Sequence, residues 1–100
     1  MKDIMVGEVY TFKLTSGEEV VARVVDTDDK YVLLHDPVSV APGPQGMGLM
    51  PSMFTANPKA ETRLNTNNVT IYALTEETVK AKYIEATTGL VVPDKKIIMG

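Results

Sequence analysis

The sequence contains no cysteine and no tryptophan, and it has a single histidine. The missing thiols exclude disulfides, thiolate metal sites and cysteine nucleophiles. One imidazole, with no nucleophile placed beside a base, leaves few groups for general acid–base or covalent catalysis. The sequence therefore predicts a protein that is not an enzyme and that holds neither a cofactor nor a metal ion.

Long apolar runs and an excess of positive charge are also missing. No stretch approaches the ~20 apolar residues of a membrane helix, and residues 1–7 lack the pattern of a signal peptide. These absences predict a cytoplasmic protein that does not enter a membrane. The 10 Lys and Arg residues are outnumbered by 13 Asp and Glu residues, for a net charge of −3. Bulk positive charge therefore cannot drive binding to nucleic acid.

What the sequence does have is a period-two alternation of apolar and polar residues. The alternation predicts strands over residues 8–15, 18–26, 30–35 and 69–74. Short polar turns at residues 16–17 and 27–29 join the first three strands into an antiparallel meander. The second strand is apolar on both faces, which is typical of a bent strand in a small barrel. In the last strand, we expect Ile71 to lie in the core.

Glycine and proline predict where regular structure stops. Residues 41–48 hold three glycines and two prolines and are predicted to be irregular, and residues 56–67 read as a polar loop. Between them, residues 49–55 are predicted to form an edge strand, because Pro51 has no N–H to donate to a ladder.

A helical period begins near the end of the chain. Thr75 is the expected N-cap of a helix over residues 75–89, and Gly89 is its expected terminator. We predict a single domain over residues 1–100 that is mainly β. It comprises a five-stranded, strongly bent antiparallel barrel over residues 8–74, a C-terminal helix and a tail over residues 90–100.

Two motifs follow each other within the predicted barrel. Residues 14–34 give a hydrophobic strand, a turn glycine, a bent second strand and a third strand that follows an aspartate. This order resembles the first Sm motif. Residues 64–69, Leu-Asn-Thr-Asn-Asn-Val, are similar to the second Sm motif, which is usually Ile-Arg-Gly-x-Asn-Val. The resemblance extends over residues 8–74 and places the chain beside the Sm, Sm-like and Hfq proteins.

These proteins form rings that bind single-stranded RNA near the pore. The resemblance implies a homo-oligomeric ring in which strand 69–74 pairs with segment 49–55 of a neighbouring subunit. It also implies RNA contacts, with Tyr31 as the base-stacking residue, from Asp28, Tyr31, Arg63, Asn65 and Asn67. An elaborated loop in so compact a chain would suit a phage-encoded member of the family.

The sequence departs from the Sm motifs at the positions that read a base. Val32 stands where the family has a base-reading asparagine, and Asn65 and Thr66 replace the arginine and glycine of the second motif. Arg63 is close to the arginine position but out of register. The resemblance thus implies stacking without a preference for uridine.

Each of these features also has a structural interpretation. Tyr31 is compatible with an ordinary strand aromatic, and the asparagines with turn residues that tolerate left-handed backbone. The aspartates at 26, 28 and 29 favour a polar turn over a calcium loop. The methionines at 47, 50 and 53 fit either core filling or an adaptable contact surface, so region 41–55 is a candidate surface for protein partners. The alternative function is therefore an oligomeric assembly module that does not bind RNA.

Overall fold

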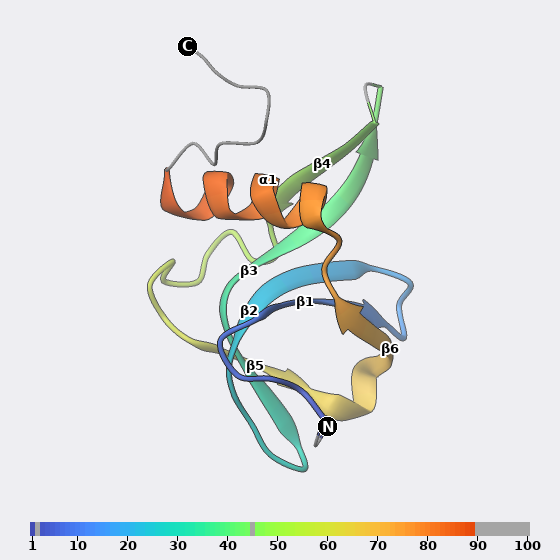
Figure 1. Cartoon of the computed structure of the whole chain (residues 1–100), viewed down its shortest axis with the longest axis vertical. Helices are drawn as coiled ribbons and strands as arrows, with labels where there is room; N and C mark the ends of the chain where they lie inside the picture. The colour runs from blue at the N-terminus through green and yellow to red at the C-terminus, as the bar shows by residue number, and fades with distance from the viewer. Residues whose placement is uncertain (2, 45, 90–100) are drawn as a thin grey trace.

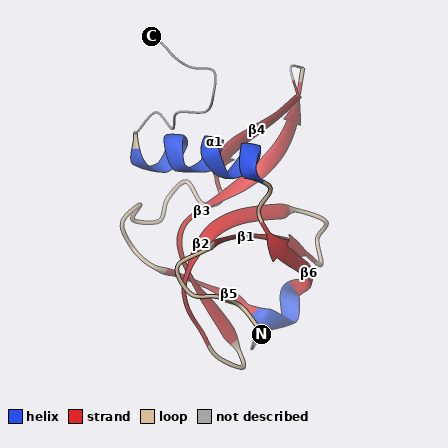
Figure 2. Ribbon diagram, in the orientation of Figure 1, coloured by secondary structure: helices blue, strands red, loops and turns tan. Residues whose placement is uncertain are grey.

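The computed structural model describes residues 1, 3–44 and 46–89 of the chain. Six strands, one short 3-10 helix and one α-helix follow each other along these residues (Figures 1 and 2). In chain order they are β1 (Val9–Leu14), β2 (Glu19–Thr27), β3 (Tyr31–Gly43), β4 (Gly46–Pro51), β5 (Thr62–Asn65), η1 (Thr66–Asn68), β6 (Val69–Leu74) and α1 (Glu77–Thr88). The protein is mainly β with a C-terminal helix, as the sequence predicts.

The strands form one antiparallel sheet with the order β4-β3-β2-β1-β6, and β5 pairs separately with β3. The long strand β3 is shared, because its first half pairs with β5 and its second half with β4. Strands β4 and β5 are thus two pieces of one return strand, separated by residues 52–61. The structure has six strands instead of the predicted five. The sheet is not closed into a barrel, because β5 pairs with β3 and is not paired with β6 among the described residues.

The apolar residues of the sheet divide into two clusters on its opposite faces. The face that the bent sheet wraps around carries the larger cluster, formed by Ile4, Tyr10, Phe12, Ala22, Val24, Val32 and Leu34. The other face carries a cluster that α1 covers, formed by Val9, Val21, Val38 and Tyr83. Strand β2 contributes to both clusters, which confirms the prediction of a strand that is apolar on both faces.

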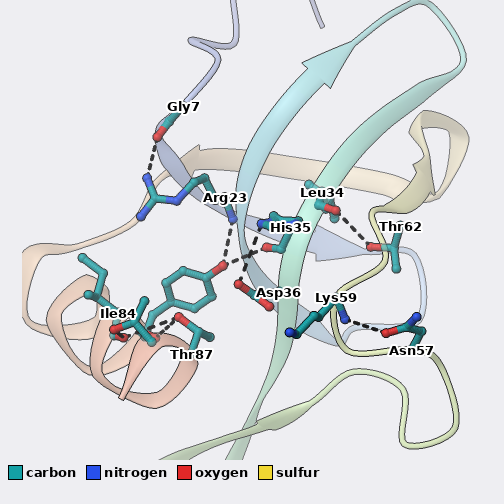
Figure 3. Close-up of polar contacts among 12 residues, drawn as sticks. Gly7, Arg23, Leu34, His35, Asp36, Asn57, Lys59, Thr62, Ile84 and Thr87 are labelled. Carbon is teal, nitrogen blue, oxygen red and sulfur yellow. Dashed lines mark hydrogen bonds and ion pairs between the residues drawn. The ribbon is translucent and has the colours of Figure 1, made fainter. Parts of the chain in front are cut away.

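Tyr83 of α1 fixes the helix to the sheet through its hydroxyl group. The side chain is 1% exposed, and its hydroxyl donates to the carbonyl oxygen of His35 at 2.8 Å. The same hydroxyl accepts from the backbone N–H of Arg23 at 3.1 Å (Figure 3). Arg23 and His35 are register partners on β2 and β3. The hydroxyl therefore bridges two backbone groups of neighbouring strands.

A bulge in β3 lies directly beside this bridge. The register between β2 and β3 shifts between Val21 and Arg23, so Ala22 faces two residues, Asp36 and Pro37. Asp36 has φ of 53°, in the left-handed region that few residues other than glycine and asparagine occupy. The bulge turns the second half of β3 away from the first, which lets the strand pair with β5 at one end and β4 at the other.

The N-terminal segment covers the larger cluster. Ile4 is buried in it, the backbone N–H of Met5 donates to the Tyr10 hydroxyl at 2.9 Å, and the Tyr72 hydroxyl donates to the Asp3 carboxylate at 2.5 Å. Arg23 holds the end of the segment through a 2.6 Å bond from its guanidinium to the carbonyl oxygen of Gly7 (Figure 3). The described residues before β1 therefore contribute to the core, through Ile4, without forming a helix.

Two segments predicted to be loops contain strands instead. In the segment 41–48, residues 41–43 of β3 pair with residues 46–48 of β4, Pro42 faces Met47, and Gly46 adopts φ of 105°. Proline fits a residue pair that exchanges no hydrogen bonds, and glycine adopts a positive φ without strain. The glycines and prolines of this segment therefore do not prevent the two strands from pairing. The polar segment 56–67 contains β5, which is held by β3 rather than by any apolar run of its own.

Two further expectations concern the chain after residue 68. Ile71 is 63% exposed, and Tyr72 packs against the larger cluster in its place, because a register shift beside Leu14 reverses the faces of β6.

Glu76, not Thr75, caps α1, and its carboxylate accepts the N–H groups of Thr78 and Val79. The predicted terminator Gly89 adopts the left-handed C-cap conformation, whereas the predicted tail 90–100 lies outside the described residues.

In the part of the chain that the structure describes, no helix has the length and apolar character needed to span a bilayer.

Replacing Tyr83 with Phe should lower the free energy of unfolding by about 1–3 kcal/mol, because the Arg23 N–H and the His35 carbonyl lose their shared partner while the ring still fills its place. Urea denaturation followed by circular dichroism measures the difference. An unchanged midpoint would show that the hydroxyl bridge contributes nothing.

The same pair of proteins gives a pH test. Burial raises the pKa of Tyr83 to about 12 from its usual value near 10. Between these values the unfolded state binds fewer protons than the folded state, so the free energy of unfolding falls as the pH rises from 10 to 12. The Tyr83→Phe variant has no hydroxyl to titrate and should lack this part of the alkaline destabilisation. The difference in free energy of unfolding between the two proteins should therefore become smaller as the pH rises from 10 to 12.

Candidate nucleic-acid interface

Four of the five residues predicted to bind RNA lie at one end of the sheet, where β3 begins and β5 ends. Tyr31 faces Asn65 across the two strands, and Leu33 faces Arg63. Val32 and Leu64, which alternate with them, point into the larger cluster. Tyr31, Leu33, Arg63 and Asn65 therefore share the outer face of this strand pair. With Asp28, they are called the Tyr31 surface below.

Asp28 shapes the turn that presents Tyr31. One oxygen of its carboxylate, Oδ1, accepts the backbone N–H groups of Lys30 and Tyr31, each at 2.8 Å. These two hydrogen bonds, with the positive charges of Lys30 and Arg63, hold the pKa of Asp28 below its usual value. The carboxylate is thus ionised at neutral pH and already engaged with the backbone. Asp28 positions the stacking residue, and its second oxygen remains beside the site.

The second predicted motif is tied to the same turn. The backbone N–H of Thr66 donates to the carbonyl oxygen of Lys30 at 2.9 Å, and its hydroxyl donates to the carbonyl oxygens of Asp29 and Lys30. The side-chain oxygen of Asn65 caps η1 by accepting the N–H of Asn67 at 2.9 Å. The side chain of Asn65 therefore keeps its NH₂ group, and one lone pair of its oxygen, for a ligand. Asn67 itself lies in η1, beyond the Tyr31 surface.

A shallow cavity of about 170 Å³ opens beside Tyr31. It is lined by Asp26, Thr27, Asp28, Tyr31, Leu33 and Arg63. Tyr31 is 39% exposed at its edge, whereas the side chain of Val32 is fully buried. An aromatic ring beside Leu33 and the Arg63 guanidinium can hold a flat, partly polar ring such as a nucleobase.

Sequence reasoning missed two residues of this region, Leu33 and Thr66. The alternation of β3 places Leu33 on the same face as Tyr31, so a signal for its position was present in the sequence. Nothing in the sequence signalled Thr66, because its contacts are to backbone carbonyls of a turn more than thirty positions away.

Negative charge surrounds the Tyr31 surface. The turn contributes Asp26, Asp28 and Asp29, against the two cations Lys30 and Arg63. A phosphate would meet a site whose nearby formal charges sum to −1. The site therefore favours contacts with the face of a base over contacts with the phosphate backbone.

A second surface consists of the two outer edges of the sheet. Within the described residues, β4 and β6 have no strand on their outer sides. Neither strand contains a charged residue. Large apolar side chains are exposed on both, with Met47 at 63% and Met50 at 44% on β4, and Ile71 at 63% and Leu74 at 51% on β6. Charged side chains usually protect free edges from pairing, and that protection is missing from these strands.

Replacing Asp28 with Ala should speed hydrogen exchange at the amides of Lys30 and Tyr31, because both lose their acceptor. Asp28→Asn keeps a side-chain oxygen at the same position and should preserve most of the protection. Exchange measured by NMR on the two variants separates the hydrogen-bonding role of Asp28 from its charge. Equal exchange rates in wild type and Asp28→Ala would contradict the positioning role.

No family model matches this chain, and no curated protein matches it significantly. What the chain does is therefore inferred from the Tyr31 surface and the two sheet edges.

Proposed function

We propose that the protein assembles head to tail into a closed ring, in which β6 of one subunit pairs with β4 of the next. The support is the pair of free, uncharged edges at opposite ends of one sheet. Two different edges that pair form a heterologous contact, and a repeated heterologous contact closes into a ring when the rotation between subunits permits it. This is the assembly that the resemblance to Sm proteins implies.

The hydrogen-bonding pattern of β4 supports an outer edge that is able to pair. Pro42 and Pro51 have no N–H, and they occupy the pairs Pro42–Met47 and Val38–Pro51. In an antiparallel ladder, pairs that exchange hydrogen bonds alternate with pairs that do not. The two proline-containing pairs, and Val40–Leu49 between them, therefore exchange no hydrogen bonds. The N–H groups of Met47 and Leu49 therefore point outward, away from β3, where a neighbouring strand would accept them.

We further propose that the ring binds single-stranded RNA by stacking bases on Tyr31, with Arg63 and the NH₂ group of Asn65 beside the stacked base. The observation that carries this proposal is the exposed Tyr31 ring, held in place by the Asp28 turn and by Thr66. One stacked base contributes about 1–3 kcal/mol. Several copies of Tyr31 on one ring can bind the same RNA strand, and binding at one site raises the effective concentration of RNA at the next. Individually weak sites therefore give a higher overall affinity.

The alternative is an oligomeric assembly module that does not bind RNA. The three carboxylates around Tyr31 favour it, because they repel a phosphate backbone. The exposed methionines of β4 also suit an adaptable protein contact. Both functions require the ring, and they differ in whether Tyr31 meets a base.

Native mass spectrometry of the wild-type protein should give one closed oligomer. Met47→Pro should yield monomers with unchanged circular dichroism, because it removes an outward N–H and leaves the ladder to β3 intact. Met47→Leu keeps both the N–H and the apolar side chain, and should remain a ring. If Met47→Pro assembles to the wild-type mass, β4 is not the assembling edge.

Fluorescence anisotropy with short uridine and adenosine oligonucleotides tests the RNA proposal. Tyr31→Ala should weaken binding at least about tenfold without changing the mass of the ring, whereas Tyr31→Phe should be nearly neutral. Salt should have a shallow effect, because few cations neutralise phosphates, and the two homopolymers should bind similarly because Val32 cannot read a base edge.

Two other results would change the conclusion. Steep salt dependence together with a neutral Tyr31→Ala would assign binding to Arg63 and the lysines instead of to stacking. A ring that binds neither oligonucleotide, even at low salt, would favour the assembly module.

A further inference from the structure

A cavity of about 440 Å³ lies between the first half of α1 and the sheet. Val21, Val40, Leu49 and Val79 line its apolar part, with Met47 at the β4 side, and its other lining side chains are polar or charged, among them Glu19, Glu76 and Lys82. Tyr83, which fixes α1 to the sheet, does not reach it, and no residue of the described chain fills the space between Met47 and Val79. The edge of β4 therefore borders a partly apolar space that the described residues leave open.

The register of the sheet shows which residues share a face with this cavity. One row of register partners crosses all five strands of the main path, running Leu49, Val40, Glu19, Lys13 and Ile71. Register partners in antiparallel strands point to the same face. Leu49 and Val40 line the cavity, so Ile71 points to the same side of the sheet at its opposite edge. Met50 and Tyr72 belong to the adjacent row and point to the other side.

We propose that Ile71 of the neighbouring subunit closes the cavity between α1 and β4, and so makes α1 part of the assembly contact. The inference rests on the proposed pairing of β6 with β4 and goes beyond it by naming the side chain and its receiving site. Because three strands separate them in an antiparallel sheet, β4 and β6 run in the same direction. When the next subunit continues the sheet in the same orientation, β6 pairs with β4 in parallel, and side chains keep their face across the junction. Ile71 then lies beside Met47 or Leu49, at the open side of the cavity.

Exposure and composition both favour Ile71 as the occupant. It is 63% exposed in the single subunit, which is unusual for a β-branched aliphatic residue in a strand, and its own cross-strand partner is the charged Lys13. Lys13 pairs with Glu19 at 4.0 Å and is directed along its own sheet. Within the described residues, Ile71 therefore has little apolar cover, whereas the α1 cavity offers apolar side chains on the β4 side.

The natural absence of cysteine allows a direct test by cross-linking. The double variants Ile71→Cys/Met47→Cys and Ile71→Cys/Leu49→Cys place thiols on the same face at the two edges, and together they cover two alignments of the strands. Ile71→Cys/Met50→Cys is the matched control with thiols on opposite faces. A disulfide requires Cα atoms about 4.4–6.8 Å apart, so only adjacent side chains react.

Mild oxidation and non-reducing electrophoresis should give covalent multimers up to the mass of the ring for at least one same-face variant. The opposite-face control and the single variants should give nothing larger than a dimer formed by random collision of exposed thiols. Reduced samples are first checked by native mass spectrometry, which shows whether each variant still assembles.

The outcomes separate the two proposals. A wild-type ring whose same-face variants assemble without cross-linking, or whose opposite-face control cross-links as well as they do, would overturn the placement of Ile71 and leave the ring intact. A monomeric wild-type protein would overturn the ring itself, and this inference with it.

A second pair of variants tests the same contact without cysteine. Ile71→Asn should raise the concentration needed for assembly at least tenfold, while Ile71→Val should assemble like the wild type. Both variants should keep the circular dichroism of the wild type, because Ile71 is exposed in the single subunit. An Ile71→Asn variant that assembles at the wild-type concentration would also overturn the placement.

Discussion

The hydroxyl group of Tyr83 is the constraint on which the rest of the structure depends. It replaces a direct contact between the backbone of Arg23 and that of His35 with a bridge through a side chain of α1. The helix is thereby fixed beside the bulge of β3, and its apolar residues cover one face of the sheet. The bulge in turn redirects β3, so that one strand serves both β5 and β4. A single buried hydroxyl therefore couples the position of the helix to the path of the longest strand.

That coupling separates the two surfaces of the protein. The first half of β3 begins at Tyr31 and is held by β5, while the second half carries β4 out toward the free edge. The Asp28 turn belongs to the first half, and the exposed methionines belong to the second. A change at the β4 edge can therefore alter the proposed assembly while the Tyr31 surface keeps its local hydrogen bonds. If β3 were straight, the Tyr31 surface and the β4 edge would lie along one continuous strand ladder, and a change at one would disturb the other.

The parts of the fold that could be predicted from the sequence depend on local patterns. Alternation located β1, β2, the start of β3 and β6, and Gly89 ended the helix. The parts that could not be predicted depend on contacts between distant residues. Strand β5 has four residues and is held by pairing with β3, and the faces of β6 are reversed by a shift beside Leu14. In the candidate site, Asp28 and Tyr31 were predictable because they lie in the stretch that resembles the first Sm motif. Thr66 acts only because folding brings it to the carbonyl oxygens of Asp29 and Lys30.

Charge decides which contacts carry the proposed RNA binding at the Tyr31 surface. A site that relies on phosphates needs a surplus of cations, and here Lys30 and Arg63 are outnumbered by the aspartates of the turn. Asp28 cannot be dispensed with to improve this balance, because its carboxylate holds the backbone of Tyr31. The residue that positions the aromatic ring is thus also one that repels the nucleic-acid backbone. Affinity must then come from the faces of several bases at once, which only an assembly of several copies can supply. In the proposed function, RNA binding therefore depends on the ring, while assembly of the ring does not depend on RNA.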